Sequence, residues 1–415
     1  MSVTVKRGKE KKTSSVKPSI RVDDRHMFLT YSRHPVTLVK GKGFYVWDSN
    51  GKKYIDFVAG LGVNNLGHCH PEVVSAVKKQ SSLLLHTSNL YFNKNQADLA
   101  RKLTSGSFAD RVFFCNSGAE ANEAAIKLVR KNSLDKYGKG RFEIITMEGS
   151  FHGRTMGALS ATGQAKIRNG FEPLVPGFKF VPLNKIELLA KAVTSKTCAI
   201  FIEPVQGEGG VNVSNADYLR EVRELAYEKD IALVFDEVQC GVGRTGKLFA
   251  YDFFDVKPDA MTISRGLGGG LPIGAMLARE DISKAFEPGS HGTTFGGGPL
   301  VSAAALATLK SMDRTVLSNC TAVGKFFLRK LKKLKTAHPV IKSVRGIGLM
   351  IGVELEIPGK EIVSKLLEAG FLVNCTMGNV LRFLPPLTIG RQEVEALVVA
   401  LDKVLCKVEE SSAGE

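Results

Sequence analysis

The sequence predicts an α/β protein whose core is a mainly parallel sheet covered by helices. Three observations predict this fold class. Short, nearly continuous apolar segments recur through the middle of the chain, each alternates with a polar-faced helical stretch, and the residues beyond about 312 depart from that pattern. Apolar strands alternating with helices are typical of parallel sheets that are buried on both faces. A smaller α+β domain is expected to follow.

The elements are expected in the following order. Residues 44–57 alternate apolar and polar side chains around Asn50-Gly51, which predicts a hairpin. Apolar strands are expected at 111–116, 197–204, 231–238, 259–265 and 273–280, with helices at 117–132 and 217–230. Beyond about residue 312, a closing helix has one apolar face, formed by positions 394, 397, 398, 401, 404, 405 and 408.

These patterns divide the chain into four parts. Residues 1–26 form a basic tail, and residues 27–75 form an N-terminal segment that is expected to pack with the small domain. A large α/β domain is expected over 76–312 and a small C-terminal α+β domain over 313–410. A chain of 415 residues has room for two or three domains at about 150 residues each.

The formal net charge of +16 comes partly from two basic clusters. Residues 1–26 hold eight Lys or Arg against three acids, and residues 325–345 hold eight and no acid. We interpret them as a tail and as a solvated helix face with Phe326, Phe327, Leu331 and Leu334 turned inward. Neither cluster is accompanied by a groove-reading motif or zinc-site spacing, so nucleic acid is not expected as a partner.

The composition also indicates the cellular compartment in which the protein is expected. The longest apolar stretches, such as 301–309, are shorter than the roughly 18 residues of a membrane span. The seven cysteines lie far apart without a C-x-x-C pair, which favours reduced thiols over disulfides or a metal site. A cytoplasmic location is therefore expected, and whether the basic tail targets an organelle is left open.

Residues suited to chemistry follow the predicted strands. NSGAEANEA (116–124) presents bare backbone N–H groups at a helix N-terminus, which is a site for phosphate. FDEVQ (235–239) ends an apolar strand with two carboxylates, and a protonated ring nitrogen is a natural partner for Asp236. Further motifs of this kind are FHGRT (151–155), EPVQGEGG (203–210) and HGTTFGGGP (291–299).

Taken together, the motifs resemble those of the class III, ornithine-type aminotransferases, which use pyridoxal 5′-phosphate on the fold type I scaffold. The likeness runs from about Tyr31 to about residue 405 and includes GHCHPEV (67–73), FDEVQCGVGRTGK and GLGGGLPIGA (266–275) in the family's order. It implies a seven-stranded central sheet, amino-acid and 2-oxo-acid substrates, and a homodimer with the active site at the interface.

The resemblance also implies roles for the cofactor-binding residues. Ser117, Gly118 and Ala119 would hold the phosphate, with Thr294 supplied by a second chain. Phe151 would stack on the pyridine ring and Val238 would pack beneath it. Asp236 would keep the ring nitrogen protonated, and Gln239 would contact the ring hydroxyl.

Four further residues would bind substrate. By the same resemblance, Arg382 would hold the α-carboxylate of glutamate or 2-oxoglutarate, and Glu208 would shield that arginine when the other amino donor binds. Arg154 would hold the far carboxylate, with Tyr31 on the same side. Leu61 stands where ornithine aminotransferases tend to have Tyr, and it favours N-acetylornithine as donor to 2-oxoglutarate, a reaction of arginine biosynthesis. Succinylornithine, ornithine and other ω-amino acids stay open.

One residue departs from the family pattern at its Schiff-base lysine position, where this chain has Arg265. A guanidinium with a pKa above about 12 has no free lone pair, so it can neither bond to the cofactor nor take up a proton. Three explanations stay open. The chain is a pseudoenzyme that binds pyridoxal or pyridoxamine phosphate or pairs with an active paralogue, it is an altered or mis-sequenced form of an active enzyme, or it is a very slow enzyme. A second departure is Gly298 in place of Asn.

Overall fold

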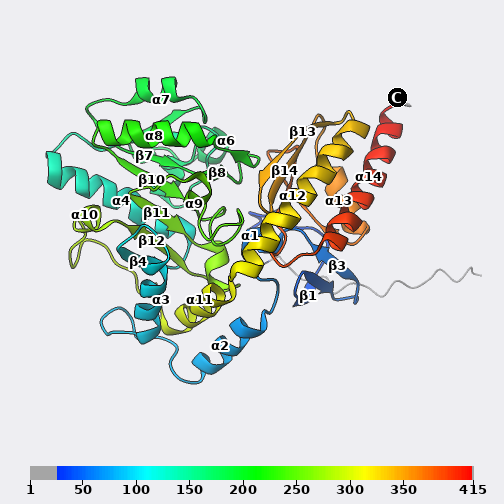
Figure 1. Cartoon of the computed structure of the whole chain (residues 1–415), viewed down its shortest axis with the longest axis horizontal. Coiled ribbons are helices and arrows are strands. Elements are labelled where there is room, and N and C mark those ends of the chain that lie inside the picture. The colour runs from blue at the N-terminus through cyan, green and yellow to red at the C-terminus, as the bar shows by residue number, and fades with distance from the viewer. Residues whose placement is uncertain (1–25, 414–415) are drawn as a thin grey trace, which may run out of the picture.

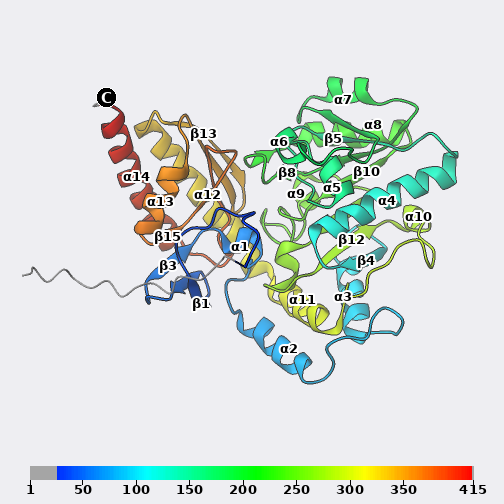
Figure 2. The same cartoon turned by 180° about the vertical axis from the view of Figure 1, so that it is seen from behind.

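The computed structural model describes residues 26–413, arranged as two groups of elements (Figures 1 and 2). The basic tail predicted over 1–26 lies outside the described residues except for its last position. None of the helices in the described residues combines the length and the apolar character that a membrane span requires.

A seven-stranded sheet forms the centre of the larger group. Its strands, in spatial order, are β4 (Arg111–Cys115), β12 (Gly274–Ala278), β11 (Ala260–Ile263), β10 (Ala232–Asp236), β7 (Thr197–Ile202), β5 (Glu143–Met147) and β6 (Phe178–Val181). All neighbouring pairs are parallel except those made by β12, which runs antiparallel to both β4 and β11. The connection from β11 to β12 is too short for the crossover that a parallel pair needs. The prediction of a mainly parallel central sheet is confirmed.

Helices cover both faces of this sheet. Because side chains alternate along a strand, Phe201 and Val234 pack with α4 (Gly118–Tyr137) in one core, while Ile200 and Leu233 lie in another with α8 (Ala216–Glu228). The remaining helices and short strands here are α2 (Pro71–Ser81), α3 (Lys94–Ser105), α5 (Met156–Ala161), α6 (Ala165–Arg168), α7 (Ile186–Ala192), β8 (Val205–Gln206), β9 (Asn212–Val213), α9 (Tyr251–Phe254), α10 (Glu280–Ser283) and α11 (Pro299–Ser311).

The second group is built on two four-stranded sheets. One is antiparallel, in the order β13 (Ile341–Ile347), β14 (Met350–Leu355), β17 (Val380–Phe383) and β16 (Asn374–Thr376). The other contains the predicted N-terminal hairpin, in the order β1 (Leu38–Lys42), β2 (Tyr45–Asp48), β3 (Lys53–Asp56) and β15 (Phe371–Leu372). Since β15 pairs with β3, the N-terminal segment shares a sheet with the C-terminal part. The domain limits at 75, 312 and 410 stay a prediction.

Three helices lie side by side in this group: α12 (Arg314–Ala337), α13 (Lys360–Glu368) and α14 (Arg391–Ala413) (Figures 1 and 2). Residues 325–337 of the basic segment form the second half of α12, with Phe327, Leu331 and Leu334 buried and Phe326 only partly buried. The predicted helix face is too long, because Lys342 and Arg345 lie in β13. The predicted apolar face of α14 is buried as expected, apart from partly buried Val398. A short helix, α1 (Ala59–Gly62), connects the hairpin to the larger group.

His338 joins the end of α12 to α14. Its Nδ1 lies 2.7 Å from Glu409 Oε2 and its Nε2 lies 2.7 Å from Asp402 Oδ1, so both ring nitrogens donate only when the imidazole is protonated. Burial by itself lowers the pKa of His338, but the hydrogen bonds to Asp402 and Glu409 outweigh it and raise the pKa above 6.5. The contribution to stability is therefore complete below about pH 6.5 and is lost as pH rises through the folded-state pKa.

The quantity to compare is the free energy of unfolding of the unmodified chain minus that of His338→Gln. We expect this difference to decrease by on the order of 1 kcal/mol as pH rises from about 6 to about 9. Denaturant titrations at several pH values measure this difference. His34→Gln, at an exposed histidine, is the matched control. A constant difference across this range would show that the two carboxylates do not hold a charged His338.

Candidate active site

A cavity of about 260 Å³ lies at the carboxyl ends of the central strands. In an open α/β sheet this edge is where ligands bind. The residues that line the cavity are Gly118, Ala119, Asn122, Phe151, His152, Gly153, Arg154, Glu203, Asp236, Val238, Gln239 and Arg265. Eight of them were predicted from the sequence as site residues: Gly118, Ala119, Phe151, Arg154, Asp236, Val238, Gln239 and Arg265.

The N-terminus of α4 forms one wall. Ser117 caps the helix by accepting a hydrogen bond from the Glu120 N–H at 3.2 Å, and Glu120 reaches back to the Asn116 N–H at 2.7 Å. The first N–H groups of a helix have no partner within it, and they favour an anion. A Cβ on Gly118 would lie 2.6 Å from Val238 Cγ1, so only glycine allows this wall to approach Val238.

Asp236 is buried and fixed by three neighbours. Its Oδ2 accepts from Asn122 Nδ2 at 2.7 Å and lies 2.8 Å from His152 Nδ1, while Oδ1 accepts from the Val238 N–H at 3.0 Å. The side-chain Oδ1 of Asn122 in turn accepts from the Thr262 hydroxyl at 2.6 Å. Sequence reasoning missed Asn122 and His152, although both lie inside motifs that it had identified.

The second carboxylate of the FDEVQ motif points elsewhere. Glu237 is fully buried and accepts hydrogen bonds from the backbone N–H groups of Ala250 and Tyr251. Burial raises its pKa to about 8. Of these two carboxylates, therefore, only that of Asp236 lines the cavity.

Glu203 positions two parts of the site. One carboxylate oxygen accepts from the Phe151 N–H at 2.8 Å, and the other accepts from the Gly207 N–H at 3.0 Å. Burial raises the pKa of Glu203 to about 7. Sequence reasoning identified its motif but gave this residue no role. Its contacts orient the Phe151 loop, where the guanidinium of Arg154 lies 5.7 Å from the ring centroid of Phe151.

Three side chains converge on Glu208. Its Oε1 lies 2.9 Å from Arg382 Nη1, 3.3 Å from Arg265 Nη2 and 3.3 Å from Gln239 Nε2. Burial alone raises the pKa of Glu208, but the guanidiniums of Arg382 and Arg265 outweigh it and hold the pKa below its ordinary value. Glu208 is therefore an ionised carboxylate between two arginines.

Arg265 begins a 3₁₀ turn (Arg265–Gly268) after β11. Its φ of 27° lies in the left-handed region, which is unfavourable for a residue with a Cβ. Its Nη1 donates to the carbonyl of Leu61 at 2.7 Å, and Leu61 itself has a φ of 63°. Burial lowers the pKa of Arg265, yet a guanidinium stays charged at neutral pH.

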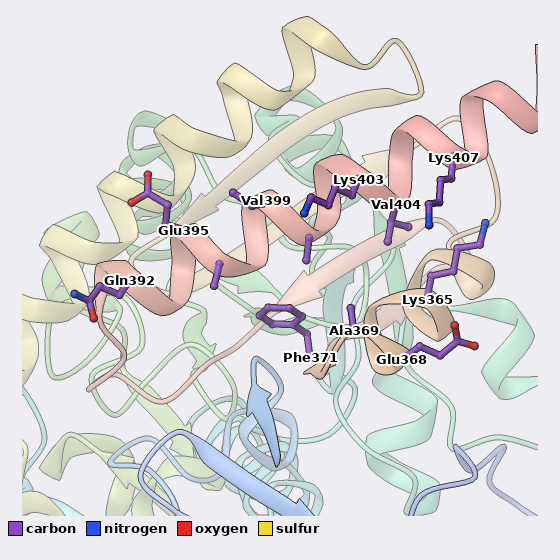
Figure 3. Close-up of a pocket in the computed structure, with 12 residues that line it drawn as sticks. Lys365, Glu368, Ala369, Phe371, Gln392, Glu395, Val399, Lys403, Val404 and Lys407 are labelled. Atoms are coloured by element: carbon purple, nitrogen blue, oxygen red, sulfur yellow. The ribbon is translucent and has the colours of Figure 1, made fainter. Parts of the chain in front are cut away.

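Five predicted site residues do not line the cavity. Ser117, Glu208 and Arg382 lie next to residues that do, whereas Tyr31 and Thr294 are exposed. Tyr31 is 74% exposed, and Thr294 is exposed on the loop that precedes α11. A larger hollow of about 860 Å³ lies between α13 and α14, where Figure 3 shows Lys365, Lys403 and Lys407 around it. It contains none of the strand-end residues, so we do not assign the active site to it.

The fold and the cavity define an α/β enzyme with its site at the ends of parallel strands, around a buried aspartate. The family model described as aminotransferase class-III matches residues 29–405, and the chain belongs to this family. Pyridoxal 5′-phosphate is the cofactor of this class, and one related structure, of Toxoplasma gondii ornithine aminotransferase, is described with partial occupancy of PLP at its active site.

Curated relatives and solved structures agree with this assignment. The acetylornithine aminotransferase of Methanocaldococcus jannaschii is 53% identical over 390 residues, covering 94% of this chain and 98% of the relative. That of Caldanaerobacter subterraneus is 50% identical, covering 94% and 99%. An ornithine aminotransferase structure from Toxoplasma gondii superposes with a TM-score of 0.90 at 36% identity, covering 94% of each chain. N-acetylornithine aminotransferase from Stenotrophomonas maltophilia gives 0.80 at 36% identity, covering 91% and 98%.

The residues of the cavity suit non-covalent binding of pyridoxal 5′-phosphate, but they do not allow its covalent attachment at residue 265. A glycine wall at a helix N-terminus suits a phosphate, and a fixed, buried carboxylate suits a protonated ring nitrogen. At residue 265, however, the side chain has no lone pair with which to form a bond.

Proposed function

We propose that this chain has the site of an aminotransferase that moves an amino group between N-acetylornithine and 2-oxoglutarate, with Arg265 at the position of the catalytic lysine. The observation that supports it most is buried Asp236, which three neighbours fix in a cavity beside a helix N-terminus. The names of the relatives support acetylornithine as donor, as does an aliphatic side chain at Leu61.

Several residues that line the cavity have a task in this proposal. The bound cofactor supplies an electron sink for the carbon that loses a proton. Asp236 would accept a hydrogen bond from the ring nitrogen and keep it protonated, while the N–H groups of Gly118 and Ala119 would hold the phosphate. Phe151 would cover the ring, and its backbone N–H is held by Glu203.

Substrate carboxylates bind to arginine in this proposal. Arg382 is 1% exposed, and its Nε and Nη2 donate to the side-chain Oδ1 of Asn374 at 3.1 and 2.8 Å, so its fork is oriented before a ligand arrives. Arg154 lines the cavity and is available for a second carboxylate. Tyr31 takes part only if the segment around it moves or a second chain covers it.

We also propose a homodimer. Large apolar side chains are exposed along one loop and one neighbouring turn: Leu83, Leu84, Leu85, Leu90, Tyr91, Phe92 and Phe295. The two segments touch, since Asn89 Nδ2 donates to the Thr293 carbonyl at 3.0 Å and the rings of His86 and Phe295 lie 4.9 Å apart. Patches of this kind mark protein–protein interfaces, and Thr294 is exposed between Thr293 and Phe295 of this one, so a second copy that covers the patch would contact it. A monomer in sedimentation experiments at micromolar concentration would count against the dimer.

We also propose that the protein works in a reducing compartment, and the evidence is the state of its cysteine thiols. All seven cysteines are free in the described part of the chain. Burial raises the pKa values of Cys115 and Cys198 to about 12, so these thiols are inert. A reducing compartment such as the cytoplasm fits them.

The substrate assignment is tested with Arg265→Lys. We expect this variant to use N-acetylornithine with a kcat/KM about tenfold or more above that for ornithine, because an aliphatic Leu61 offers no partner to the free ammonium of ornithine. Amino transfer to 2-oxoglutarate is measured with both donors, and with succinylornithine. Leu61→Tyr in the same background is the matched control and should shift the preference toward ornithine. A preference for ornithine before that change would contradict the assignment.

A second function is specifically supported by Arg265, namely a non-catalytic protein that binds pyridoxal or pyridoxamine phosphate or completes the site of an active paralogue. Binding without turnover in the unmodified chain favours it. Co-purification with a lysine-bearing paralogue would favour the paired form.

A further inference from the structure

A cluster of side chains with metal-binding atoms lies where the end of α12 meets α14, two helices that run side by side (Figures 1 and 2). His338, Asp402 and Cys406 each offer one ligand atom, and these three atoms all lie within 4.8 Å of one another. Asp402 and Cys406 are four residues apart on α14, so their side chains share one face of that helix. Imidazole nitrogen, carboxylate oxygen and thiolate sulfur are the donor types that bind Zn²⁺ in proteins.

The imidazole of His338 lies between two carboxylates and satisfies both only together with a cation. Its Nδ1 is 2.7 Å from Glu409 Oε2, and its Nε2 is 2.7 Å from Asp402 Oδ1. A neutral imidazole carries one N–H, so it donates to one of these carboxylates and presents a lone pair to the other. A second proton removes that conflict. A metal ion bound by Nε2 and Asp402 removes it equally well.

Glu409 is placed to orient the ring of His338 for a metal ion. Its other oxygen, Oε1, accepts from the Val340 N–H at 3.4 Å, which holds the carboxylate beside Nδ1. The His338 backbone is fixed as well, since its N–H donates to the Leu334 carbonyl at 3.1 Å. Histidines that bind metals commonly donate their other ring N–H to a carboxylate, which orients the ring and makes the metal-binding nitrogen more basic. The pair of Glu409 and His338 has this arrangement.

The cluster needs only a small side-chain adjustment to reach tetrahedral zinc geometry. With Zn–N and Zn–O distances of about 2.0–2.2 Å and a Zn–S distance of about 2.3 Å, the ligand atoms lie about 3.3–3.6 Å apart. Nε2 of His338 and Oδ1 of Asp402 would separate slightly, and the sulfur of Cys406 would move by roughly 1 Å. The side chain of Asp402 is 51% exposed and Cys406 is exposed, so both can turn and an ion can enter from solvent.

We infer that His338, Asp402 and Cys406 form a zinc-binding site that fastens the end of α12 to α14, with Glu409 as the residue that positions His338. Cys406 binds as a thiolate, so its proton passes to solvent as the Zn–S bond forms. Three protein ligands leave the fourth position to water. The cysteine spacing gave no sign of this site, because His338 lies 64 residues before Asp402 and Cys406 is not part of a C-x-x-C pair.

The test is a titration of the full-length chain with Co²⁺ and then Zn²⁺, after metal has been removed with EDTA and the thiols have been kept reduced. Cobalt reports on its ligands, because a cobalt–thiolate bond absorbs in the near ultraviolet. We expect about one equivalent of Co²⁺ to produce this absorption and Zn²⁺ to abolish it, since such sites bind zinc more tightly than cobalt. Zn²⁺ should also raise the midpoint of thermal unfolding, because it binds the folded chain.

Variants at the cluster separate the ligands from the positioning residue. Cys406→Ser should remove the cobalt–thiolate absorption, and both Cys406→Ser and His338→Gln should weaken zinc binding about tenfold or more. Glu409→Gln should keep the absorption but weaken zinc binding by roughly tenfold. Cys69→Ser is the matched control, because it removes an exposed thiol that is not part of the cluster. Both the absorption and the zinc affinity should be unchanged in this control.

The inference is overturned if the metal-free chain gives no cobalt–thiolate absorption, or if Cys406→Ser keeps it, which would assign the metal to another cysteine. It is also overturned if Cys406→Ser binds zinc as tightly as the parent. Thermal melts in EDTA verify that each variant folds. None of these residues lines the strand-end cavity, so these outcomes are independent of amino transfer by Arg265→Lys. The pH dependence of unfolding expected for His338 applies to the chain stripped of metal.

Discussion

Arg265→Lys is expected to form a covalent bond to pyridoxal 5′-phosphate that the unmodified chain does not form. After borohydride reduction, the peptide that contains residue 265 should gain the mass of the reduced cofactor in the variant only. The reason is chemical: a lysine amine releases its proton to give a lone pair, whereas a guanidinium does not. Amino transfer should rise by about 1000-fold, because the same amine takes and returns the proton during turnover.

The surroundings of residue 265 favour formation of this covalent bond by a lysine. Burial lowers the pKa of the side chain at this position, and it would lower that of a lysine as well, which increases the fraction of free amine. Arg265→Met is the control, because it removes the guanidinium without supplying an amine. Labelling of Lys247 or Lys257 in the unmodified chain would contradict the expectation and assign the bond to another residue.

Much of the site could be predicted from the sequence because strand ends converge. Parallel strands bring their carboxyl ends to one edge, so motifs that follow different strands meet although they are far apart in sequence. For this reason Gly118, Phe151 and Asp236 were predicted together and line one cavity. The family resemblance added their roles, which the geometry accommodates but does not test.

Other parts could not be predicted. Asn122 and His152 hold Asp236 across 114 and 84 residues of sequence, and that pairing depends on side-chain directions which no local pattern encodes. The apolar pattern of β12 likewise does not show that this strand runs antiparallel to its neighbours. That direction follows from the short connection between β11 and β12. Thr294 has a role only with a second chain. The contacts of Arg265 depend on the unusual backbone at Leu61.

Asp236→Asn in the Arg265→Lys background is expected to lower kcat by roughly 100- to 1000-fold while the chain still folds and binds the cofactor. The amide has nearly the shape of the carboxylate and keeps a carbonyl oxygen toward Asn122 or Val238. It lacks the negative charge that keeps a ring nitrogen protonated, so the electron sink weakens. The pH dependence of the cofactor absorption spectrum should change together with kcat, which a merely structural loss would not produce.

The adjacent carboxylate provides the matched control for Asp236. Because the Glu237 carboxyl is turned toward the backbone N–H groups of Ala250 and Tyr251, Glu237→Gln makes the same carboxyl-to-amide change without altering a group that lines the cavity. Thermal melts verify that it folds, since the amide nitrogen cannot accept one of these two hydrogen bonds. We expect its kcat to stay within about twofold of the parent. If Asp236→Asn kept more than about a third of the parent activity, charge at Asp236 would not drive the reaction. The fixed hydrogen bonds from Asn122, His152 and Val238 would then be serving only the packing of the sheet edge.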